Sequence, residues 1–278
     1  MTQALSFLRP KNTNLEAPLF VYLSGMDGTG QLLRTQMESL QQGFDVRCVA
    51  IPANNLQGWN TLATQVIDLI AAELKQRSHS SIYLCGESFG GCLAMKVAVR
   101  SPFAISGLIL SNPASSFSQQ PLFGVVAPTA TSWVPEFLLR SSAIALLPFL
   151  AALGRIAARD RGDLLTAMQS LPPKTLSWRL SLLRDFQIEP EELCRFSPPV
   201  LLIAGARDRL LPSVAEAQRL ARQFPNARIA ILPDSGHACL LETDTQLCEI
   251  LRAYDLIKEN DPDANESQLR NNSELMIN

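Results

Sequence analysis

The stretch Tyr83–Met95, with the sequence YLCGESFGGCLAM, constrains the fold of this chain more than any other segment. A strand-like run, Ser81–Cys85, ends at a glycine, Ser88 follows, and two more glycines lead into a helical pattern. Glycines on both sides of a serine leave room for a sharp strand-to-helix turn with strained backbone angles. The pattern G-x-S-x-G at Gly86–Gly90 therefore predicts a nucleophile elbow that raises the Ser88 hydroxyl above the edge of a sheet. The alternative is a plain strand-to-helix turn that merely contains a serine.

Short β-branched runs alternate with helical patterns along most of the chain, which predicts an α/β fold with a mostly parallel, doubly wound sheet. Strands are expected at Leu19–Leu23, Phe44–Ile51, Ser81–Cys85, Gly107–Leu110, Pro199–Ala204 and Ala227–Leu232. Helices are expected at Leu62–Lys75, Gly91–Val99, Ser213–Phe224 and Thr243–Leu256. Open sheets of this kind bind ligands at their carboxyl edge, so functional residues are expected in the loops that follow the strands.

The strand pattern breaks between Pro113 and Ser197, where prolines recur and the segments between them have the character of short helices. An insertion of about 80 residues is too long for a plain connection and is usually functional. We therefore predict an all-helical cap at residues 113–197, inserted before the strand that bears the acid, over a core formed by residues 1–112 and 198–257. Residues 258–278 are strongly polar and are predicted to form a disordered tail.

The composition excludes several classes of function. Hydrophobic residues make up 47% of the chain and charged residues 18%, as in a globular protein with a sizeable core. A net charge of −2 provides no basic surface for nucleic acid. The six cysteines are scattered, without the spacing of a metal site, and several lie in apolar runs, which indicates small buried side chains in a reducing compartment. We expect no metal, no organic cofactor, no signal peptide and no membrane span, and hence a cytoplasmic location.

A serine nucleophile needs a general base, and the chain offers two histidines, His79 and His237. His79 precedes the strand of the elbow, so it is expected at the opposite, amino edge of the sheet. His237 follows the last predicted strand and is therefore expected at the same edge as Ser88. We predict that His237 is the base.

The acid that orients the histidine should follow a strand and precede the histidine in the chain. Asp208 meets this condition, because it comes shortly after the strand Pro199–Ala204. Asp185 and Asp234 are rivals, although Asp234 is better placed to shape the turn before His237. We predict Asp208 as the acid, against the alternative of a solvated aspartate in a turn.

An oxyanion hole would complete the site. The backbone N–H of Phe89 comes with the elbow, and the second donor should come from the loop after the first core strand, Ser24–Gly30, where Met26 is predicted. This loop lacks the patterns of a phosphate-binding loop, which disfavours a nucleotide site. Glu87, directly before the serine, is expected to be an elbow neighbour held by hydrogen bonds and is not a convincing second nucleophile.

Five motifs resemble the α/β-hydrolase superfamily and, more narrowly, the hydrolase-like half of the phytyl ester synthase (esterase/lipase/thioesterase) family. They are LSGMDGTG (Leu23–Gly30), CGESFGG (Cys85–Gly91), LPPKTLSWRLSLLRDF (Leu171–Phe186), GARDRLLPS (Gly205–Ser213) and DSGHACLLE (Asp234–Glu242). The resemblance implies that Ser88, Asp208 and His237 form a catalytic triad, and that the substrates are esters of long-chain alcohols and acyl groups exchanged in photosynthetic membranes.

This sequence departs from the family at two places. Many superfamily members carry His-Gly before the oxyanion donor, whereas this chain has Ser24-Gly25. The second half of the full-length family carries an H-x-x-x-x-D acyltransferase motif, whereas here Leu84 stands five residues after His79. We therefore expect the chemistry of the hydrolase-like half.

The predicted cap is rich in leucine, alanine, phenylalanine and valine, as in PLFGVVAPTATSWVPEFLLRSSAIALLPFLAALG at residues 121–154. Burial contributes about 0.8 kcal/mol per CH₂, so an apolar tunnel would bind a long chain well. The sequence thus predicts a serine esterase or acyltransferase for a small lipophilic ester, with transient contact to a membrane surface. An acyl thioesterase and a non-catalytic lipid-binding protein are the alternatives, and the oligomeric state is left open.

Overall fold

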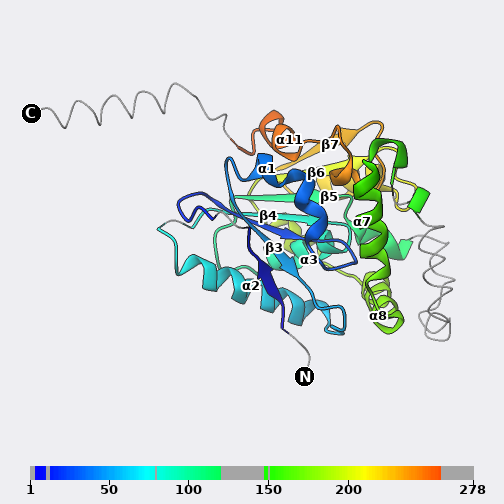
Figure 1. The fold of residues 1–278 in the computed structure, drawn as a ribbon. Coiled ribbons are helices and arrows are strands. Elements are labelled where there is room, and N and C mark those ends of the chain that lie inside the picture. The colour runs from blue at the N-terminus through cyan, green and yellow to red at the C-terminus, as the bar shows by residue number, and fades with distance from the viewer. Residues whose placement is uncertain (1–3, 11–12, 79, 120–146, 150, 258–278) are drawn as a thin grey trace, which may run out of the picture.

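The computed structural model describes residues 4–10, 13–78, 80–119, 147–149 and 151–257. A twisted sheet runs through the middle of the molecule and helices cover both of its faces (Figure 1). The strands are β1 (Ser6–Leu8), β2 (Leu19–Leu23), β3 (Asp45–Ala50), β4 (Ile82–Glu87), β5 (Gly107–Ser111), β6 (Val200–Gly205) and β7 (Ala227–Leu232). The α-helices are α1 (Met37–Leu40), α2 (Trp59–Leu74), α3 (Phe89–Ala98), α7 (Ala158–Gln169), α8 (Pro173–Arg184), α9 (Pro190–Cys194), α10 (Ser213–Ala221) and α11 (Leu247–Ala253). Short 3₁₀ helices are η1 (Gln31–Gln36), η2 (Ala114–Gln119), η3 (Leu153–Arg155) and η4 (Cys239–Leu241).

The described strands form one sheet in the order β1-β3-β2-β4-β5-β6-β7. β1 pairs with β3 antiparallel, and the other pairs are parallel. The prediction of a mostly parallel, doubly wound α/β sheet is confirmed. Because β2, β4, β6 and β7 run in the same direction, the loops that follow them meet at one edge of the sheet.

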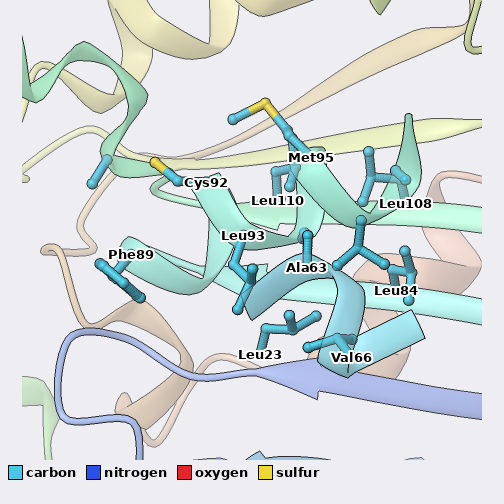
Figure 2. Packing of buried hydrophobic residues seen from close by; sticks show 14 of the residues in the cluster. Leu23, Ala63, Val66, Leu84, Phe89, Cys92, Leu93, Met95, Leu108 and Leu110 are labelled. Atoms are coloured by element: carbon cyan, nitrogen blue, oxygen red, sulfur yellow. The ribbon is translucent and has the colours of Figure 1, made fainter. Parts of the chain in front are cut away.

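Alternate residues of the strands supply two cores, one on each face of the sheet. Leu19, Val21 and Leu23 of β2 join the cluster under α2, α3 and α10, whereas Phe20 and Tyr22 join the cluster under α1 and α11. Figure 2 shows the first of these cores, where side chains of α2 and α3 pack together against the strands. All five residues of β2 are buried, as expected for a strand covered on both faces.

Several elements differ from the sequence prediction: α1 was not expected, α2 begins at Trp59 and not at Leu62, and two further differences have a clear physical reason. β1 was not expected, because three residues at the sheet edge are too few to show an alternating pattern. The last helix was expected to begin at Thr243 but begins at Leu247. The buried side chain of Gln36 explains this later start: its amide donates to the carbonyls of Leu240 and Thr245 and accepts from the Leu247 N–H. These bonds hold the backbone before α11 in a loop.

The segment predicted as a cap is described only in part. Its described residues form helices and no strand, while residues 120–146 and 150, like the predicted tail 258–278, lie outside the described residues. Leu182, Leu183 and Phe186, in and just after α8, belong to the same core cluster as α2 and α3. α8 is therefore packed onto the core, and the division of the chain into core, cap and tail stays a prediction. Of the helices in the described ranges, none combines the length and apolar character needed to cross a membrane.

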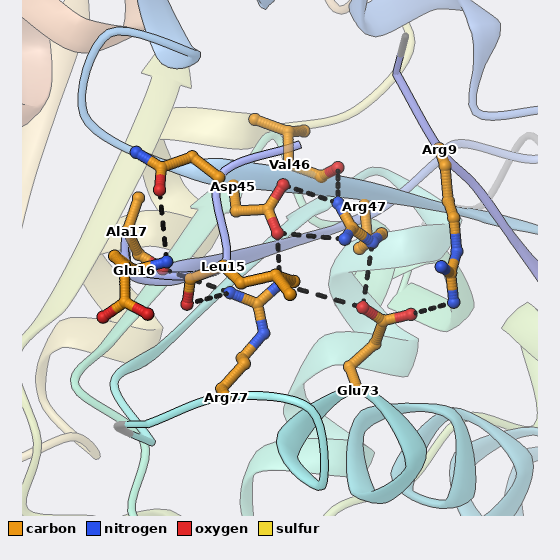
Figure 3. Close-up of polar contacts among 10 residues, drawn as sticks. Arg9, Leu15, Glu16, Ala17, Asp45, Val46, Arg47, Glu73 and Arg77 are labelled. Carbon is orange, nitrogen blue, oxygen red and sulfur yellow. Dashed lines mark hydrogen bonds and ion pairs between the residues drawn. The ribbon is translucent and has the colours of Figure 1, made fainter. Parts of the chain in front are cut away.

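A buried network of charges joins β3, α2 and the segment after β1 (Figure 3). Arg47, which is fully buried in β3, makes two bonds to Asp45, at 2.7 and 2.9 Å, and one of 3.1 Å to Glu73 of α2. Arg9 binds the other oxygen of Glu73 at 2.7 Å, and Arg77 binds Asp45. Burial raises the pKa of Asp45, but bonds and charge from Arg47 and Arg77 outweigh it and lower the pKa overall.

We predict that Arg47→Met lowers the free energy of unfolding by about 3–5 kcal/mol, because it leaves buried carboxylates without their main partner. The control is Arg228→Met, which removes an exposed ion pair with Asp255 and should cost about 0–1 kcal/mol. Urea unfolding monitored by circular dichroism measures both. Equal losses in the two variants would contradict the prediction.

Candidate active site

The elbow has the geometry that its sequence predicts. Ser88 lies between β4 and α3 with φ 54° and ψ −115°, a conformation that few non-glycine residues adopt. Its N–H donates to the carbonyl of Ser111 at 3.0 Å, and its own carbonyl accepts from Ala114 at 3.1 Å. These bonds to the end of β5 hold the strained turn in place.

Two glycines are required by close backbone approach at this turn. A Cβ on Gly90 would lie well under 3.0 Å from the carbonyl oxygens of Leu23 and Ser24, and a Cβ on Gly86 would collide with the Gly90 backbone. The N-terminus of α3 therefore packs directly against the end of β2. This contact brings the Ser24–Gly30 loop beside Ser88, and a Cβ on Gly25 would lie 3.9 Å from Ser88 Cβ.

His237 and Asp208 meet Ser88 at the carboxyl edge of the sheet. The Oγ of Ser88 is 2.9 Å from Nε2 of His237, and Nδ1 of the same ring is 2.7 Å from Oδ2 of Asp208. Asp208 follows β6 and His237 follows β7, so three distant segments supply one chain of hydrogen bonds. The His237 side chain is 5% exposed and that of Asp208 is 1% exposed.

The surroundings of Asp208 favour a carboxylate. Burial raises its pKa, but the charge and hydrogen bond of His237, the Ser213 hydroxyl and the Leu211 N–H outweigh burial and lower the pKa below its usual value. The N–H groups of Leu210 and Leu211 donate to Oδ1 at 2.8 and 3.0 Å. Asp208 therefore stays ionised beside the imidazole and can orient it.

The pKa of His237 is governed by opposing effects. Burial favours the neutral ring, but the charge and hydrogen bond of Asp208 and the charge of Glu87 outweigh burial and raise the pKa above 6.5. A ring whose Nδ1–H donates to Asp208 presents Nε2 to the Ser88 hydroxyl as an acceptor. The arrangement can thus remove a proton from Ser88 and return it to a leaving group.

The predicted oxyanion loop is held by its own turn. The carboxylate of Asp27 accepts from the Thr29 N–H at 2.8 Å and from the Thr29 hydroxyl, while Gly28 and Gly30 have φ near +70°. Met26 precedes this turn, and Phe89 begins α3, whose helix dipole favours negative charge near Ser88. The loop follows β2 and the helix follows β4, so both lie beside the serine at the carboxyl edge of the sheet.

Glu87 is buried beneath the site and accepts a hydrogen bond from the hydroxyl of Tyr22. Burial raises the pKa of Glu87, and the bond from Tyr22 and the charge of His237 oppose this rise only in part. Burial also raises the pKa of Tyr22. Of the two roles considered for Glu87, a neighbour of the elbow held by a hydrogen bond matches this geometry.

The two rival aspartates form ion pairs with arginines. Asp234 pairs with Arg207 at 2.7 Å, and Asp185 pairs with Arg184 at 2.7 Å. Both aspartates are more than half exposed. His79 lies outside the described residues.

Sequence analysis missed Asn112, which joins the two loops that bear His237 and Asp208. Its Nδ2 donates to the carbonyl of His237 at 2.6 Å, and its Oδ1 accepts from the N–H of Gly205 at 2.8 Å. Asn112 has φ 42°, an unusual value that its position at the end of β5 requires. A polar residue directly after a buried strand was the available signal.

Sequence analysis also assigned no role to Arg179 of α8, although its motif was noted. Arg179 is 2% exposed and shares the buried face of the helix with Thr175, Leu182 and Leu183. The signal in the sequence for a special role of Arg179 is an arginine on an apolar helical stripe.

For metals, the described ranges contain no group of three or more His, Cys, Asp or Glu side chains able to hold an ion.

The profile of the family described as "Serine aminopeptidase, S33" matches residues 53–244. The chain belongs to this family of α/β hydrolases. The expected superfamily is thereby confirmed, and the fold comparisons agree. MenH from S. aureus superposes with a TM-score of 0.71 at 17% identity over 90% of this chain and 97% of that one. The esterase EaEST from Exiguobacterium antarcticum gives 0.71 at 18% identity over 90% of this chain and 94% of that one.

Curated relatives of this hydrolase are esterases, hydrolases and ester synthases. Phytyl ester synthase 1, chloroplastic, of Arabidopsis thaliana is 30% identical over 274 residues, which cover 88% of this chain but 39% of that protein. The chain thus spans about two fifths of the length of the phytyl ester synthases that it matches, and for Phytyl ester synthase 2, chloroplastic, the share is 37%. Pimeloyl-(acyl-carrier protein) methyl ester esterase of Vibrio parahaemolyticus is 26% identical and is covered over 94% of its length.

We predict that Gly90→Ala lowers the free energy of unfolding by about 1–3 kcal/mol or more, because the added methyl group must displace backbone. The matched control is Gly43→Ala, where a Cβ meets nothing within 4 Å. That variant should leave the free energy of unfolding unchanged or raise it by about 0.4–1 kcal/mol, because alanine lowers the conformational entropy of the unfolded chain. Opposite signs in urea unfolding support the close contact, and equal effects would contradict it.

The pH dependence of ester cleavage should report His237. The neutral ring is the active form, so kcat/KM should rise with pH, with a midpoint above 6.5 because Asp208 raises the pKa. Asp208→Asn removes this charge, whereas the burial that lowers the pKa of His237 remains. The midpoint should therefore move to lower pH, and kcat should fall by about 10⁴. A midpoint that stays in place, measured with a soluble chromogenic ester, would contradict this assignment.

Proposed function

We propose that this chain is a serine hydrolase of carboxylic esters. Ser88 is the nucleophile, His237 the general base and acid, and Asp208 the group that orients His237. The continuous hydrogen-bonded chain from Ser88 Oγ through His237 to Asp208 is the observation that carries this proposal. The esterases among the relatives support the same class of reaction.

The proposed reaction proceeds through an acyl-serine. His237 Nε2 takes the proton from Ser88 Oγ as this oxygen bonds to the ester carbonyl carbon. The backbone N–H groups of Met26 and Phe89 stabilise the oxyanion, and the tetrahedral intermediate collapses as the alcohol leaves with the proton from His237. Water, or an acceptor alcohol, then gives its proton to His237 and attacks the acyl carbon. As the acyl–oxygen bond to Ser88 breaks, His237 returns this proton to Ser88 Oγ.

The proposed substrate is a small lipophilic ester of an acyl or phytyl-type chain. The apolar composition of residues 121–154 supports this class, and two relatives are named phytyl ester synthases. Transfer of the acyl group to an alcohol is the variant of the same mechanism that those names favour. We further propose that the chain acts in the cytoplasm with transient contact to a membrane surface, a photosynthetic one by analogy with the chloroplastic relatives.

Labelling by a fluorophosphonate probe tests the nucleophile. The wild-type protein should be labelled covalently, and Ser88→Ala should lose the label with its circular dichroism spectrum retained. Ser181→Ala, on α8, whose hydroxyl donates to the Trp178 carbonyl, is the control and should label normally. If the wild-type protein is not labelled but still binds lipid, the result contradicts the enzyme proposal and favours a non-catalytic lipid-binding protein.

The leaving group is tested separately with p-nitrophenyl esters and acyl-CoA thioesters of matched chain length. Faster turnover of esters, increasing with chain length, is the expected result. Preference for the thioesters would make the protein an acyl thioesterase. An added long-chain alcohol that converts released acid into ester would show transfer.

A further inference from the structure

We propose that Arg179 is a positioning residue that orders the oxyanion hole from within α8. This inference rests on the proposed function, because it concerns the two backbone donors assigned to that site. The guanidinium is buried and reaches the surroundings of both donors, Met26 and Phe89. α8 therefore contributes to the catalytic geometry although it contains no group of the triad.

The first step of the argument is the contact with the loop. Arg179 Nη1 donates to the carbonyl of Met26 at 2.5 Å, and Nη2 donates to the carbonyls of Pro52 and Ile51 at 3.1 and 3.5 Å. The guanidinium thus joins the loop after β2 to the end of β3. Holding this carbonyl fixes the peptide plane between Met26 and Asp27 and with it the Cα of Met26, to which the peptide unit with the Met26 N–H is attached.

Gly28 makes room for this contact. A Cβ on Gly28 would lie 2.6 Å from Nη1 of Arg179 and 3.0 Å from Ile51, and the residue has φ +71°. Gly28 is therefore needed for two reasons: it adopts the positive φ of the turn, and its missing side chain leaves space for the guanidinium. The Ile51 carbonyl accepts from Arg179, and the Ile51 N–H donates to the Gly28 carbonyl at 2.8 Å.

The second step is the contact with the other donor. The Arg179 guanidinium lies 5.9 Å from the centre of the Phe89 ring, within the range of a cation–π contact. The Trp59 ring packs against Phe89 at 4.6 Å between centroids, and its Nε1 donates to the carbonyl of Leu182 at 2.9 Å. α8 thus contacts the residue that begins α3 both directly and through Trp59.

The chemistry of the side chain supports a positioning role. A buried ion is an inefficient way to stabilise a core, because an apolar residue of similar volume is often as good or better. The planar fork of arginine, however, can hold several carbonyl oxygens at once in fixed directions. Burial lowers the pKa of Arg179 to about 10, opposed by the charge of Asp27, so the group stays charged at neutral pH.

The experiment compares Arg179→Met and Arg179→Lys with the wild type and with Arg184→Met. Arg184 is exposed on the same helix and pairs with Asp185, so its variant is the matched control. Loss of one oxyanion donor lowers kcat by about 10²–10³. We expect a fall of about 10² in kcat for Arg179→Met with KM nearly unchanged, a smaller fall for Arg179→Lys, and no change for Arg184→Met.

Inhibitor binding separates positioning from a general loss of structure. A trifluoromethyl ketone with a long alkyl chain adds to Ser88 and places an oxyanion in the hole, whereas the matched alcohol binds without one. The affinity of Arg179→Met for the ketone should fall in parallel with kcat, while affinity for the alcohol stays within about 2-fold. If Arg179→Met does not fold, the same comparison is made with Arg179→Lys.

Two negative results have different meanings. A wild-type protein that neither turns over esters nor reacts with a fluorophosphonate overturns the proposed function and this inference with it. A wild-type protein that reacts, together with a folded Arg179 variant whose kcat and ketone affinity stay within about 2-fold, overturns this inference alone. Equal losses of ketone and alcohol affinity would also overturn it, because they indicate a purely structural role.

Discussion

The close backbone contact between α3 and the end of β2 is the constraint on which the site depends. Gly90 leaves no room for a Cβ beside the carbonyls of Leu23 and Ser24, so the helix begins directly against the strand. One consequence is the strained conformation of Ser88, and another is the proximity of the oxyanion loop to that serine. Ser88, the proposed nucleophile, and the groups proposed to stabilise an oxyanion beside it are therefore positioned by one packing contact.

The electrostatics of the site follow from partners that are built into the fold. Asp208 is nearly inaccessible to solvent, yet it remains ionised because backbone N–H groups, Ser213 and His237 all donate to it. Glu87 is also buried and accepts a hydrogen bond from Tyr22, and burial raises its pKa. Two carboxyl groups of the site thus have opposite pKa directions, because the charge and hydrogen bonds around Asp208 outweigh its burial, whereas those around Glu87 do not.

Membership of the S33 family and the fold of the esterase neighbours agree with the geometry, but they leave the substrate open over a wide range. The relatives are named as a synthase of phytyl esters, an esterase of pimeloyl-carrier-protein methyl esters and a putative hydrolase of carbamates. The arrangement of Ser88, His237 and Asp208 is compatible with all of these substrates, since it would act on a carbonyl and not on the group attached to it. Within the segment between β5 and β6, both Ala114, which donates to the Ser88 carbonyl, and Arg179 of α8, which donates to the Met26 carbonyl, reach the site.

The sequence by itself determined the sheet, the elbow and its serine. Buried strands and a strained turn have local requirements, β-branched runs and flanking glycines, that are visible in a short window. The order of residues along the chain also favoured His237 and Asp208, because parallel strands bring their carboxyl ends to one edge. The short β1 and the late start of α11 escaped prediction, since a sheet edge and the buried Gln36 decide them.

Only the tertiary structure decided which polar side chains meet. Asp208, Asp185 and Asp234 all stand in polar turns, and the sequence cannot measure that only the first lies 2.7 Å from the imidazole. Asn112 and Arg179 act on loops about 125 and 153 residues away, respectively, so no local pattern records their partners. A hydrogen bond depends on distances of tenths of an ångström, and these are set by packing of the whole sheet and its helices.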